Sequence, residues 1–408
     1  MLFLMDVILL RTAGLLVVAM LVAIIARRIR LPYTVGLVLT GVVLALARID
    51  TGIVLTHDLI FDGILPPLLF EAALCIHWSE LRRDVLPVLT LATLGVVISA
   101  IVVAIGTASL LGWPISSALI FGVLIAATDP VAVIAMFKDT GVKGRLRLLV
   151  ESESLLNDGV AAVLFALVLA SAQAAGGEST TAVQAVRALL LTAGGGTFVG
   201  LVCGAIAIAL AGRTTDHLVE TALTVIVAYG SFLLAEQLHV SGVLATVAAG
   251  LLMGNFGALN AREQTAPAFE DREFVMAFWE FAAFVANSLI FLLIGVTVAG
   301  IPFSGFGLAA LAIIVVLVLI GRALTVYPLC LIFARSRWAI PMPAQHILWW
   351  GGLRGALALA LALALPPSLA FRNEIVIATF GVVAFSVVAQ GLTMSPFLRV
   401  LGLKPSRP

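Results

Sequence analysis

Long apolar segments follow one another along nearly the whole sequence. Of the 408 residues, 62% are hydrophobic and 11% are charged, whereas a soluble globular chain carries roughly 25% charged residues. A run of about 20 apolar residues can cross the hydrocarbon core of a bilayer, which is roughly 30 Å thick. The sequence therefore predicts an all-α protein that crosses a lipid bilayer many times, without a soluble domain of ordinary size between the spans.

Apolar runs bounded by charge, proline or glycine predict thirteen transmembrane helices. An odd number suits two six-helix repeats of inverted topology, formed by helices 1–6 and 8–13, with helix 7 as the connector. The expected ranges are 7–26, 33–48, 57–76, 85–111, 115–137, 145–172, 184–212, 217–236, 240–256, 274–299, 306–333, 344–365 and 374–402.

The distribution of Lys and Arg predicts the orientation, because cytoplasmic loops hold an excess of both. With the amino terminus outside, 17 of these residues fall on the cytoplasmic side, whereas only Arg48 and Arg372 fall on the other side. We therefore expect a multi-pass protein of the cell (inner) membrane with a cytoplasmic carboxyl terminus. The net charge of +1 gives no indication of a nucleic-acid partner.

Two of the predicted helices are interrupted near their middles. The fifth contains Thr128, Asp129 and Pro130, where proline removes a backbone donor. The twelfth contains three glycines around Arg354. These helices hold equivalent places in the two repeats, and paired interruptions indicate an ion site at the membrane midplane, because unwound carbonyls and half-helix ends can coordinate an ion. Thr128 and Asp129 also suit a helix cap, which would place their oxygens beside the same site.

The helix predicted at 145–172 concentrates polar side chains at membrane depth. At 3.6 residues per turn, Glu153 lies below Asn157 and Ser154 lies below Asp158, so their oxygens face one neighbourhood. Such oxygens can replace water around a small hard cation. A charge at the bilayer centre costs at least roughly 2.5–3.5 kcal/mol. Because an apolar run follows Asp158 directly, we predict a functional role for its carboxylate.

Other buried charges are expected to pair. Arg354 keeps its proton and needs a carboxylate, and pairing with Glu153 would hold that side chain ionised, leaving it at most a secondary cation ligand. Glu71, Glu280 and Arg322 are expected to neutralise one another between helices.

These features together resemble the electroneutral sodium/proton antiporters, a family with bacterial, archaeal and animal members. The resemblance covers essentially the whole chain. It departs at the carboxyl end, where the long cytoplasmic tail of the animal members is missing, so regulation through a tail is not expected. The motifs that carry the resemblance are Phe70-Glu71, Thr128-Asp129-Pro130, Glu153-Ser154-Leu155-Leu156-Asn157-Asp158-Gly159, Phe278-Trp279-Glu280 with Asn287-Ser288, and Gly351-Gly352-Leu353-Arg354-Gly355-Ala356.

The resemblance implies exchange of Na⁺, and also of Li⁺, for H⁺, with a role in pH homeostasis, no cofactor and no enzymatic reaction. It also implies a structural ion pair between Glu153 and Arg354. The implied cation ligands are Asp158, Ser154, Asp129 and the backbone at Thr128, with Asn157 organising the site.

The resemblance further implies a homodimer with two kinds of unit. Residues 85–174 and 304–408 would form a mobile ion-transport core. Residues 1–84 would belong to a dimerisation scaffold, and residues 175–303 would supply the connector helix and the rest of that scaffold.

The cost of burying charge predicts how one carboxylate exchanges two ions. A core that carries a bare carboxylate across the membrane pays the insertion cost, whereas a core neutralised by a proton or by Na⁺ does not. Competition for Asp158 therefore produces exchange. Because Asn157 cannot titrate, we expect one cation per proton and no net movement of charge.

Three other functions are weighed against this one. The same fold can exchange K⁺, or both K⁺ and Na⁺, because cavity size and ligand number decide selectivity. A cation channel needs a continuous pore with rings of charge from several subunits, which the internal inverted pattern disfavours. An intramembrane aspartyl protease needs two Asp side chains in contact. Asp129 and Asp158 are candidates, but this function leaves Asn157 and the Glu153–Arg354 pair without a role.

Overall fold

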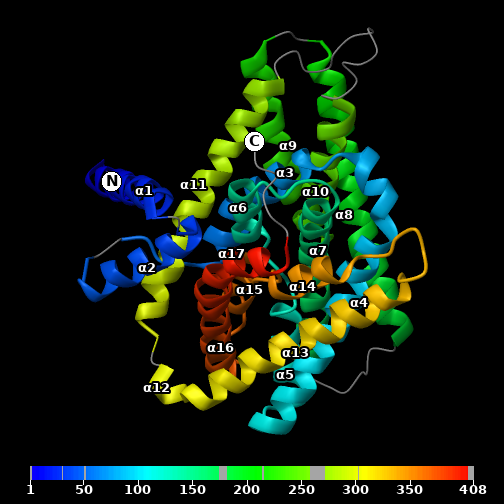
Figure 1. Ribbon diagram of the computed structural model, residues 1–408. Coiled ribbons are helices and arrows are strands. Elements are labelled where there is room, and N and C mark those ends of the chain that lie inside the picture. The colour runs from blue at the N-terminus through cyan, green and yellow to red at the C-terminus, as the bar shows by residue number, and fades with distance from the viewer. Residues whose placement is uncertain are drawn as a thin grey trace.

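Helices form the secondary structure of the chain (Figure 1). The computed structural model describes residues 2–29, 31–49, 52–173, 182–213, 216–257, 272–301 and 303–402, and it contains no strand in those ranges. Some basic residues that bear on the predicted orientation, among them Arg262 and Lys404, lie outside the described residues. The elements, in chain order, are α1 (Leu2–Ile29), α2 (Tyr33–Leu46), the π-helix η1 (Leu59–Ile64), α3 (Leu65–Cys75), α4 (Trp78–Leu111), α5 (Ile115–Leu124), α6 (Val131–Thr140), α7 (Arg145–Gln173), α8 (Ala182–Ala211), α9 (His217–Gln237), α10 (Gly242–Leu252), the π-helix η2 (Met253–Gly257), α11 (Arg272–Ala299), α12 (Phe303–Phe306), α13 (Leu308–Ile332), α14 (Met342–Trp350), α15 (Ala356–Leu363), α16 (Arg372–Phe385), the π-helix η4 (Ser386–Gln390) and α17 (Gly391–Val400).

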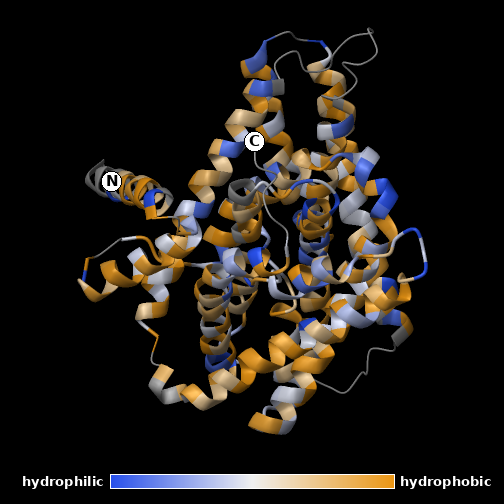
Figure 2. Cartoon of the chain, viewed as in Figure 1, coloured by the Kyte–Doolittle hydropathy of each residue, from blue (hydrophilic) through white to orange (hydrophobic). Residues whose placement is uncertain are grey.

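Seven helices in the described ranges are long and apolar enough to cross a membrane: α4, α7, α8, α9, α11, α13 and the continuous segment Arg372–Val400. Hydrophobic residues predominate along these helices, as Figure 2 shows, and many of their apolar side chains are exposed. On α4, for example, Leu94 is 54% exposed and Ile105 is 56% exposed. Apolar surface of this extent is unusual for a protein in water, and it is expected where the surrounding solvent is lipid.

The helices occupy the ranges predicted from the apolar runs, with ends that differ by a few residues in most cases. The largest difference is at α4, which begins at Trp78 and not at residue 85. Its polar first turns are stabilised by the neighbouring helix, because the Arg145 guanidinium at the start of α7 donates to the Asp84 carboxylate over 2.7 Å. Hydropathy alone therefore placed the start of this helix too late.

Both predicted interruptions are confirmed, and they are bonded to each other. Helix α5 ends at Leu124 and α6 begins at Val131, while α14 ends at Trp350 and α15 begins at Ala356. Between them, the Asp129 backbone N–H donates to the Leu353 carbonyl over 2.7 Å. Unwound backbone inside a membrane must find its partners within the protein, and each interruption here supplies them for the other.

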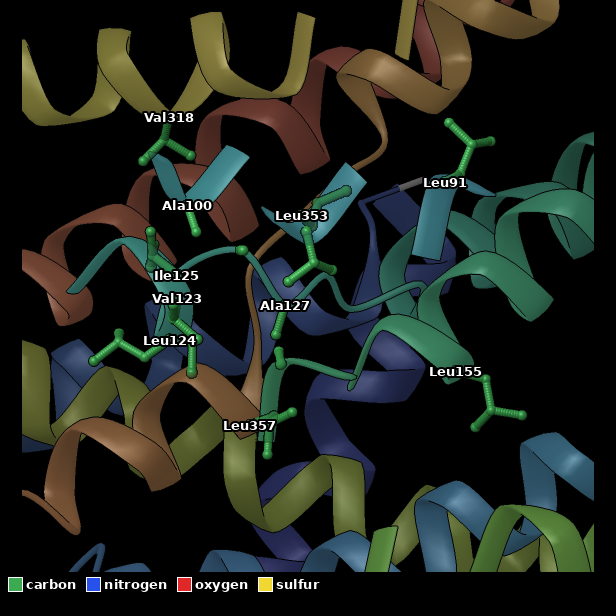
Figure 3. Close-up of a cluster of buried hydrophobic side chains, with 14 of the residues drawn as sticks. Leu91, Ala100, Val123, Leu124, Ile125, Ala127, Leu155, Val318, Leu353 and Leu357 are labelled. Carbon is green, nitrogen blue, oxygen red and sulfur yellow. The ribbon is translucent and has the colours of Figure 1, made fainter. Parts of the chain in front are cut away.

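Apolar side chains surround the place where the two interruptions meet (Figure 3). Leu91 and Ala100 of α4, Leu155 of α7 and Val318 of α13 are all buried, and they belong to one cluster with Leu353 of the second interruption. This cluster keeps lipid and bulk water away from the unwound backbone. Polar contacts beside it are correspondingly strong, because the local dielectric is low.

Helices α2 and α11 touch through their backbones. A Cβ atom added at Gly41 would meet the Leu292 carbonyl oxygen, and one added at Gly295 would meet the Val38 carbonyl oxygen. Such close approach through small residues is typical of tightly associated membrane helices. We infer that α2 and α11 behave as one rigid pair.

Candidate cation-binding site

Helix α7 carries four polar side chains into the interior beside the first interruption. Glu153 and Ser154 are each 2% exposed and Asn157 is fully buried, whereas Asp158 retains partial exposure. The helix continues unbroken through these positions, so its own backbone is satisfied and the side chains are available to other segments. The sequence-predicted grouping of these four residues is therefore present in the fold.

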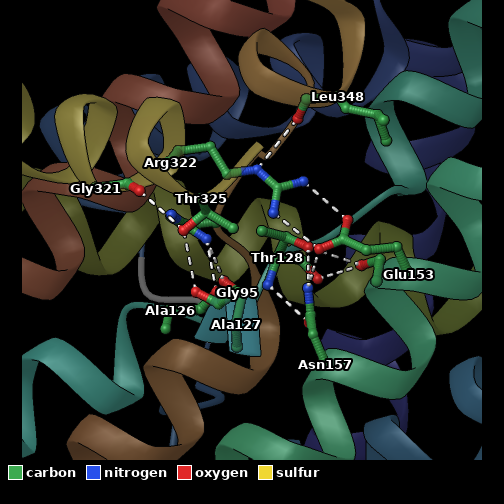
Figure 4. A network of polar contacts seen from close by, with 12 residues as sticks. Gly95, Ala126, Ala127, Thr128, Glu153, Asn157, Gly321, Arg322, Thr325 and Leu348 are labelled. Atoms are coloured by element: carbon green, nitrogen blue, oxygen red, sulfur yellow. Dashed lines mark hydrogen bonds and ion pairs between the residues drawn. The ribbon is translucent and has the colours of Figure 1, made fainter. Parts of the chain in front are cut away.

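Two of these side chains hold Thr128 in place. Asn157 Nδ2 donates to Thr128 Oγ1 over 2.6 Å, and Asn157 Oδ1 accepts from the Thr128 backbone N–H over 3.2 Å. The Ser154 hydroxyl donates to the Thr128 carbonyl, and Thr128 Oγ1 donates to Ser154 Oγ over 3.2 Å. Figure 4 shows Asn157 and Thr128 facing each other in this network. The unwound segment thus has its position fixed by α7.

The predicted ion pair between Glu153 and Arg354 is wrong, because Glu153 pairs with Arg322 of α13 instead. Arg322 Nη1 and Nη2 each donate to one carboxylate oxygen of Glu153 over 2.8 Å, and Arg322 Nε donates to the Leu348 carbonyl over 3.1 Å (Figure 4). Two parallel bonds between planar groups form the strongest type of protein ion pair.

Arg354 has other partners, because it lies in the second interruption, between α14 and α15. Its Nη1 donates to the carbonyls of Ala126 and Ala127 over 2.8 and 3.0 Å, at the point where α5 has ended. Its backbone N–H donates to the Ser386 hydroxyl over 3.0 Å. Unsatisfied carbonyls at a helix end attract a cation. Here they bind the Arg354 guanidinium, which was predicted to pair with Glu153.

The expected mutual neutralisation of Glu71, Glu280 and Arg322 is therefore wrong for Arg322, which is bound to Glu153. Glu280 lies on an exposed position of α11. Glu71 lies in α3 and lines the cavity described next. The sequence could not separate these acids because each follows an aromatic residue in an apolar helix.

A cavity of about 90 Å³ lies between α3, α7, α11 and the two interruptions. One water molecule needs roughly 10–15 Å³ measured in this way, so the cavity has room for a cation with several waters. Among the described residues, no group of three or more His, Cys, Asp or Glu side chains is arranged to hold a resident metal. The residues that line the cavity are Leu65, Leu68, Leu69, Glu71, Ala72, Ala127, Thr128, Asp129, Pro130, Val131, Glu151, Leu155, Asp158, Asn287, Gly355, Ala356, Leu357 and Ala358.

Two residues that line this cavity have a buried oxygen without a hydrogen-bond donor from the described residues: Asp158 Oδ1 and Asn287 Oδ1. A buried acceptor without a partner costs roughly 1–3 kcal/mol. The two carboxylates therefore differ in their hydrogen bonding, because Arg322 donates to both oxygens of Glu153.

Asp129 reaches the same cavity from the first interruption. Its Oδ1 accepts from the Val131 backbone N–H over 2.9 Å, at the start of α6. A Cβ atom at Gly355 would overlap the Asp129 carboxylate, so the second interruption makes room for it through the absence of a side chain. The N-cap residue of α6 is Pro130, so Asp129 bonds the first N–H of the helix from one position further out. Asp129 and Asp158 line the same cavity.

The structure divides the predicted ligands into two groups. Asp158, Asp129 and Thr128 line the cavity, whereas Ser154 and Glu153 border a smaller space on the other side of Thr128. Two residues near the site had no predicted role: Asn287, which lies in one of the family motifs, and Ser386, which bonds the Arg354 backbone. An amide within the apolar run of α11 was the available signal for Asn287.

The chain is similar to known proteins over most of its length. The sequence pattern described as "Sodium/hydrogen exchanger, transmembrane" matches residues 16–400. The Na⁺/H⁺ antiporter ApNhaP of Aphanothece halophytica is 40% identical over 92% of this chain and 70% of its own length. The low-affinity Na⁺/H⁺ antiporter NhaS1 of Synechocystis is 39% identical over 93% of this chain and 71% of its own length. The solved structure of the sodium proton antiporter MjNhaP1 from Methanocaldococcus jannaschii has a similar fold, with a TM-score of 0.74 and 22% identity over 98% of this chain and 99% of that one.

Proposed function

Because this chain belongs to the sodium/hydrogen exchanger family and exchanges Na⁺ for H⁺ across a membrane, we propose that Asp158 is the carboxylate for which the two ions compete. The protein is an integral membrane transporter and not an enzyme. The observation that supports the role of Asp158 is its Oδ1, which is buried at the cavity and receives no hydrogen bond from the described residues. Such an oxygen can take either a proton or a small hard cation.

In this proposal the cation lies between Asp158 and Asp129. The carbonyl and hydroxyl oxygens of Thr128 are the nearest neutral ligands, and water supplies the rest. These three residues line one cavity. Asn157 and Ser154 position Thr128 through the bonds described above, and Ser154 becomes a direct ligand if its hydroxyl turns from the Thr128 carbonyl to the ion. The scheme uses no cofactor besides the transported ions.

The charge count of the core supports exchange of one cation for one proton. At the interruptions and the α7–α13 contact, Glu153, Asp129 and Asp158 are opposed by two guanidinium groups, Arg322 and Arg354. Of the other acids at the cavity, Glu151 pairs with Arg147, and Glu71 lies in α3, outside the proposed core. The three carboxylates therefore exceed the cations by one charge. One bound Na⁺ or one proton neutralises the core, and a neutral core avoids the cost of moving charge through the membrane interior.

In this scheme, the segments 85–174 and 304–408 move as the ion-carrying core, and the segments 1–84 and 175–303 provide the connector and a scaffold through which two copies form a homodimer. The backbone contact between α2 and α11 supports a stiff scaffold. Thirteen spans arranged as inverted repeats, in the cell (inner) membrane with the amino terminus outside, complete the proposal.

The test is exchange in proteoliposomes, with Na⁺, Li⁺ and K⁺ compared across pH for the wild type and Asp158→Asn. We expect Asp158→Asn to abolish exchange, whereas the control Asp216→Asn should retain it, because Asp216 caps α9 and asparagine caps equally well. Competition at one carboxylate also means that a tenfold higher Na⁺ concentration moves the acidic limb of the pH profile down by about one pH unit. Normal Na⁺-driven proton flux by Asp158→Asn would overturn the assignment. Equal fluxes with K⁺ and Na⁺ would favour the broader cation specificity.

A further inference from the structure

Helix α11 contributes a polar residue to the wall of the same cavity. Asn287 lies near the middle of α11 and lines the cavity with Asp158. Its Oδ1 is buried and receives no hydrogen bond from the described residues, which is also true of Asp158 Oδ1. Two residues with an unbonded buried acceptor oxygen, one charged and one neutral, therefore line a single cavity.

The neighbours of Asn287 on α11 have other partners. Ala286 and Ile290 are buried in the apolar cluster that includes α2 and α15. The Ser288 hydroxyl bonds the Tyr33 hydroxyl and the Phe284 carbonyl. Leaving an amide oxygen unpaired in this surrounding is unfavourable, so its position needs a reason other than packing.

A cation supplies that reason. Small hard cations prefer oxygen ligands and combine carboxylates with neutral carbonyl oxygens. We propose that the Asn287 amide oxygen is a cation ligand that α11 contributes to the Asp158 cavity, and that it holds Na⁺ or Li⁺ in one of the two access states only. This inference rests on the proposed function, because it requires Asp158 to bind the cation.

The restriction to one access state follows from where Asn287 is attached. Its helix is fixed to α2 by the contacts at Gly41 and Gly295, whereas Asp158 belongs to α7. When the proposed core moves against the scaffold, Asp158 separates from Asn287, and the cation loses a ligand. A proton on Asp158 needs no second ligand, so the proton affinity does not depend on Asn287.

The direction of the cavity indicates the side of the membrane at which Asn287 binds the cation. The cavity extends along α7 from Asp158 to Glu151, about 10 Å at the helical rise per residue. That direction leads to the end of α7 that bears Arg145 and Arg147, which is the proposed cytoplasmic side. Asn287 should therefore strengthen cation binding from this side and not from the opposite one.

Two variants remove the oxygen in different ways, and one retains it. Asn287→Leu keeps the branched shape without polarity, Asn287→Ala removes the side chain, and Asn287→Asp keeps an oxygen at the same position. The control is Thr297→Ala on the same helix, where the hydroxyl donates to the Leu293 carbonyl one turn earlier. Each variant is checked for a wild-type elution profile and melting temperature.

The measurement is the Na⁺ concentration for half-maximal exchange, taken in everted and in right-side-out membrane vesicles. For Asn287→Leu and Asn287→Ala we expect a rise of about tenfold or more when Na⁺ is offered from the proposed cytoplasmic side. From the opposite side, and in the maximal rate, we expect less than a twofold change. Asn287→Asp and Thr297→Ala should keep a low half-saturating concentration.

Half-saturation values for Asn287→Leu that match Thr297→Ala on both sides would overturn the inference, as would an equal rise on both sides. If Asn287→Ala fails to fold, the isosteric Asn287→Leu variant and the Asn287→Asp variant still decide the question. Failure of the proposed function gives a different result, because exchange would then persist in Asp158→Asn whatever the Asn287 variants show.

Discussion

Replacement of Arg322 by glutamine tests the arrangement at the centre of the core. Arg322 donates two hydrogen bonds of 2.8 Å to Glu153, and the two side chains are 7% and 2% exposed. In Arg322→Gln, the Glu153 carboxylate stays in the core and loses the cation that balances it. Removing one partner of a buried pair costs roughly 3–5 kcal/mol. We expect the free energy of unfolding to fall by an amount in this range.

A double-mutant cycle separates the pair from the loss of a single side chain. Glu153→Gln with Arg322→Gln removes both charges and leaves the net charge of the core unchanged, so most of the stability should return, with a coupling of roughly 2–3 kcal/mol. The matched cycle of Glu153→Gln with Arg354→Gln should give a coupling below roughly 1 kcal/mol, because Arg354 bonds the carbonyls of Ala126 and Ala127.

Equilibrium unfolding in mixed detergent micelles, followed by tryptophan fluorescence, measures these free energies. Proteoliposome flux measures function, and we expect the double variant to exchange ions while Arg322→Gln does not. A larger coupling in the Arg354 cycle would contradict the pairing of Glu153 with Arg322. A double variant that loses as much stability as the two single variants together would contradict it as well.

Three further outcomes follow from the same geometry. Exchange should not respond to a membrane potential set with valinomycin, because the loaded core is neutral in both forms, and a rate that follows the voltage would contradict the charge count. Gly355→Ala places a Cβ on the Asp129 carboxylate and should lower the exchange rate at least roughly tenfold, whereas Gly230→Ala, with open space around it, should leave the rate unchanged. Asn157→Asp replaces the donor that lies 3.1 Å from Glu153 Oε1 with a second anion, so both the melting temperature and the flux should fall, and wild-type values for both would be evidence against this network.

Much of the fold follows from local sequence features. Runs of apolar residues determine where helices lie, because every backbone group in lipid must be bonded within the chain. Pro130 and the glycines around Arg354 mark the interruptions, since proline and glycine act on their own local backbone. The π-helical segments η1 and η4 were not predicted, because nothing in their composition distinguishes them from the α-helices they adjoin.

Pairing between distant side chains was harder to predict. Arg322 and Arg354 both lie in apolar segments of the second half, and either could have satisfied Glu153 by charge alone. Arg354 bonds the carbonyls of Ala126 and Ala127 instead. These carbonyls lack helical partners because the helix is interrupted there, which is a property of the folded chain. The position of Asn287 in the wall of the cavity that Asp158 lines likewise depends on the packing of α11, and its role stays a prediction.

The bonds between the two interruptions also bear on how the protein is made. Ala126 and Arg354 are 228 positions apart, and the Asp129 backbone finds its partner in Leu353. Until the ribosome has released that later segment, the first interruption lies in the membrane with open carbonyls, at a cost of several kcal/mol for each unsatisfied group. The centre of the molecule therefore forms late in biogenesis, and an interrupted nascent chain would expose the same backbone groups that later bond Arg354 and Leu353.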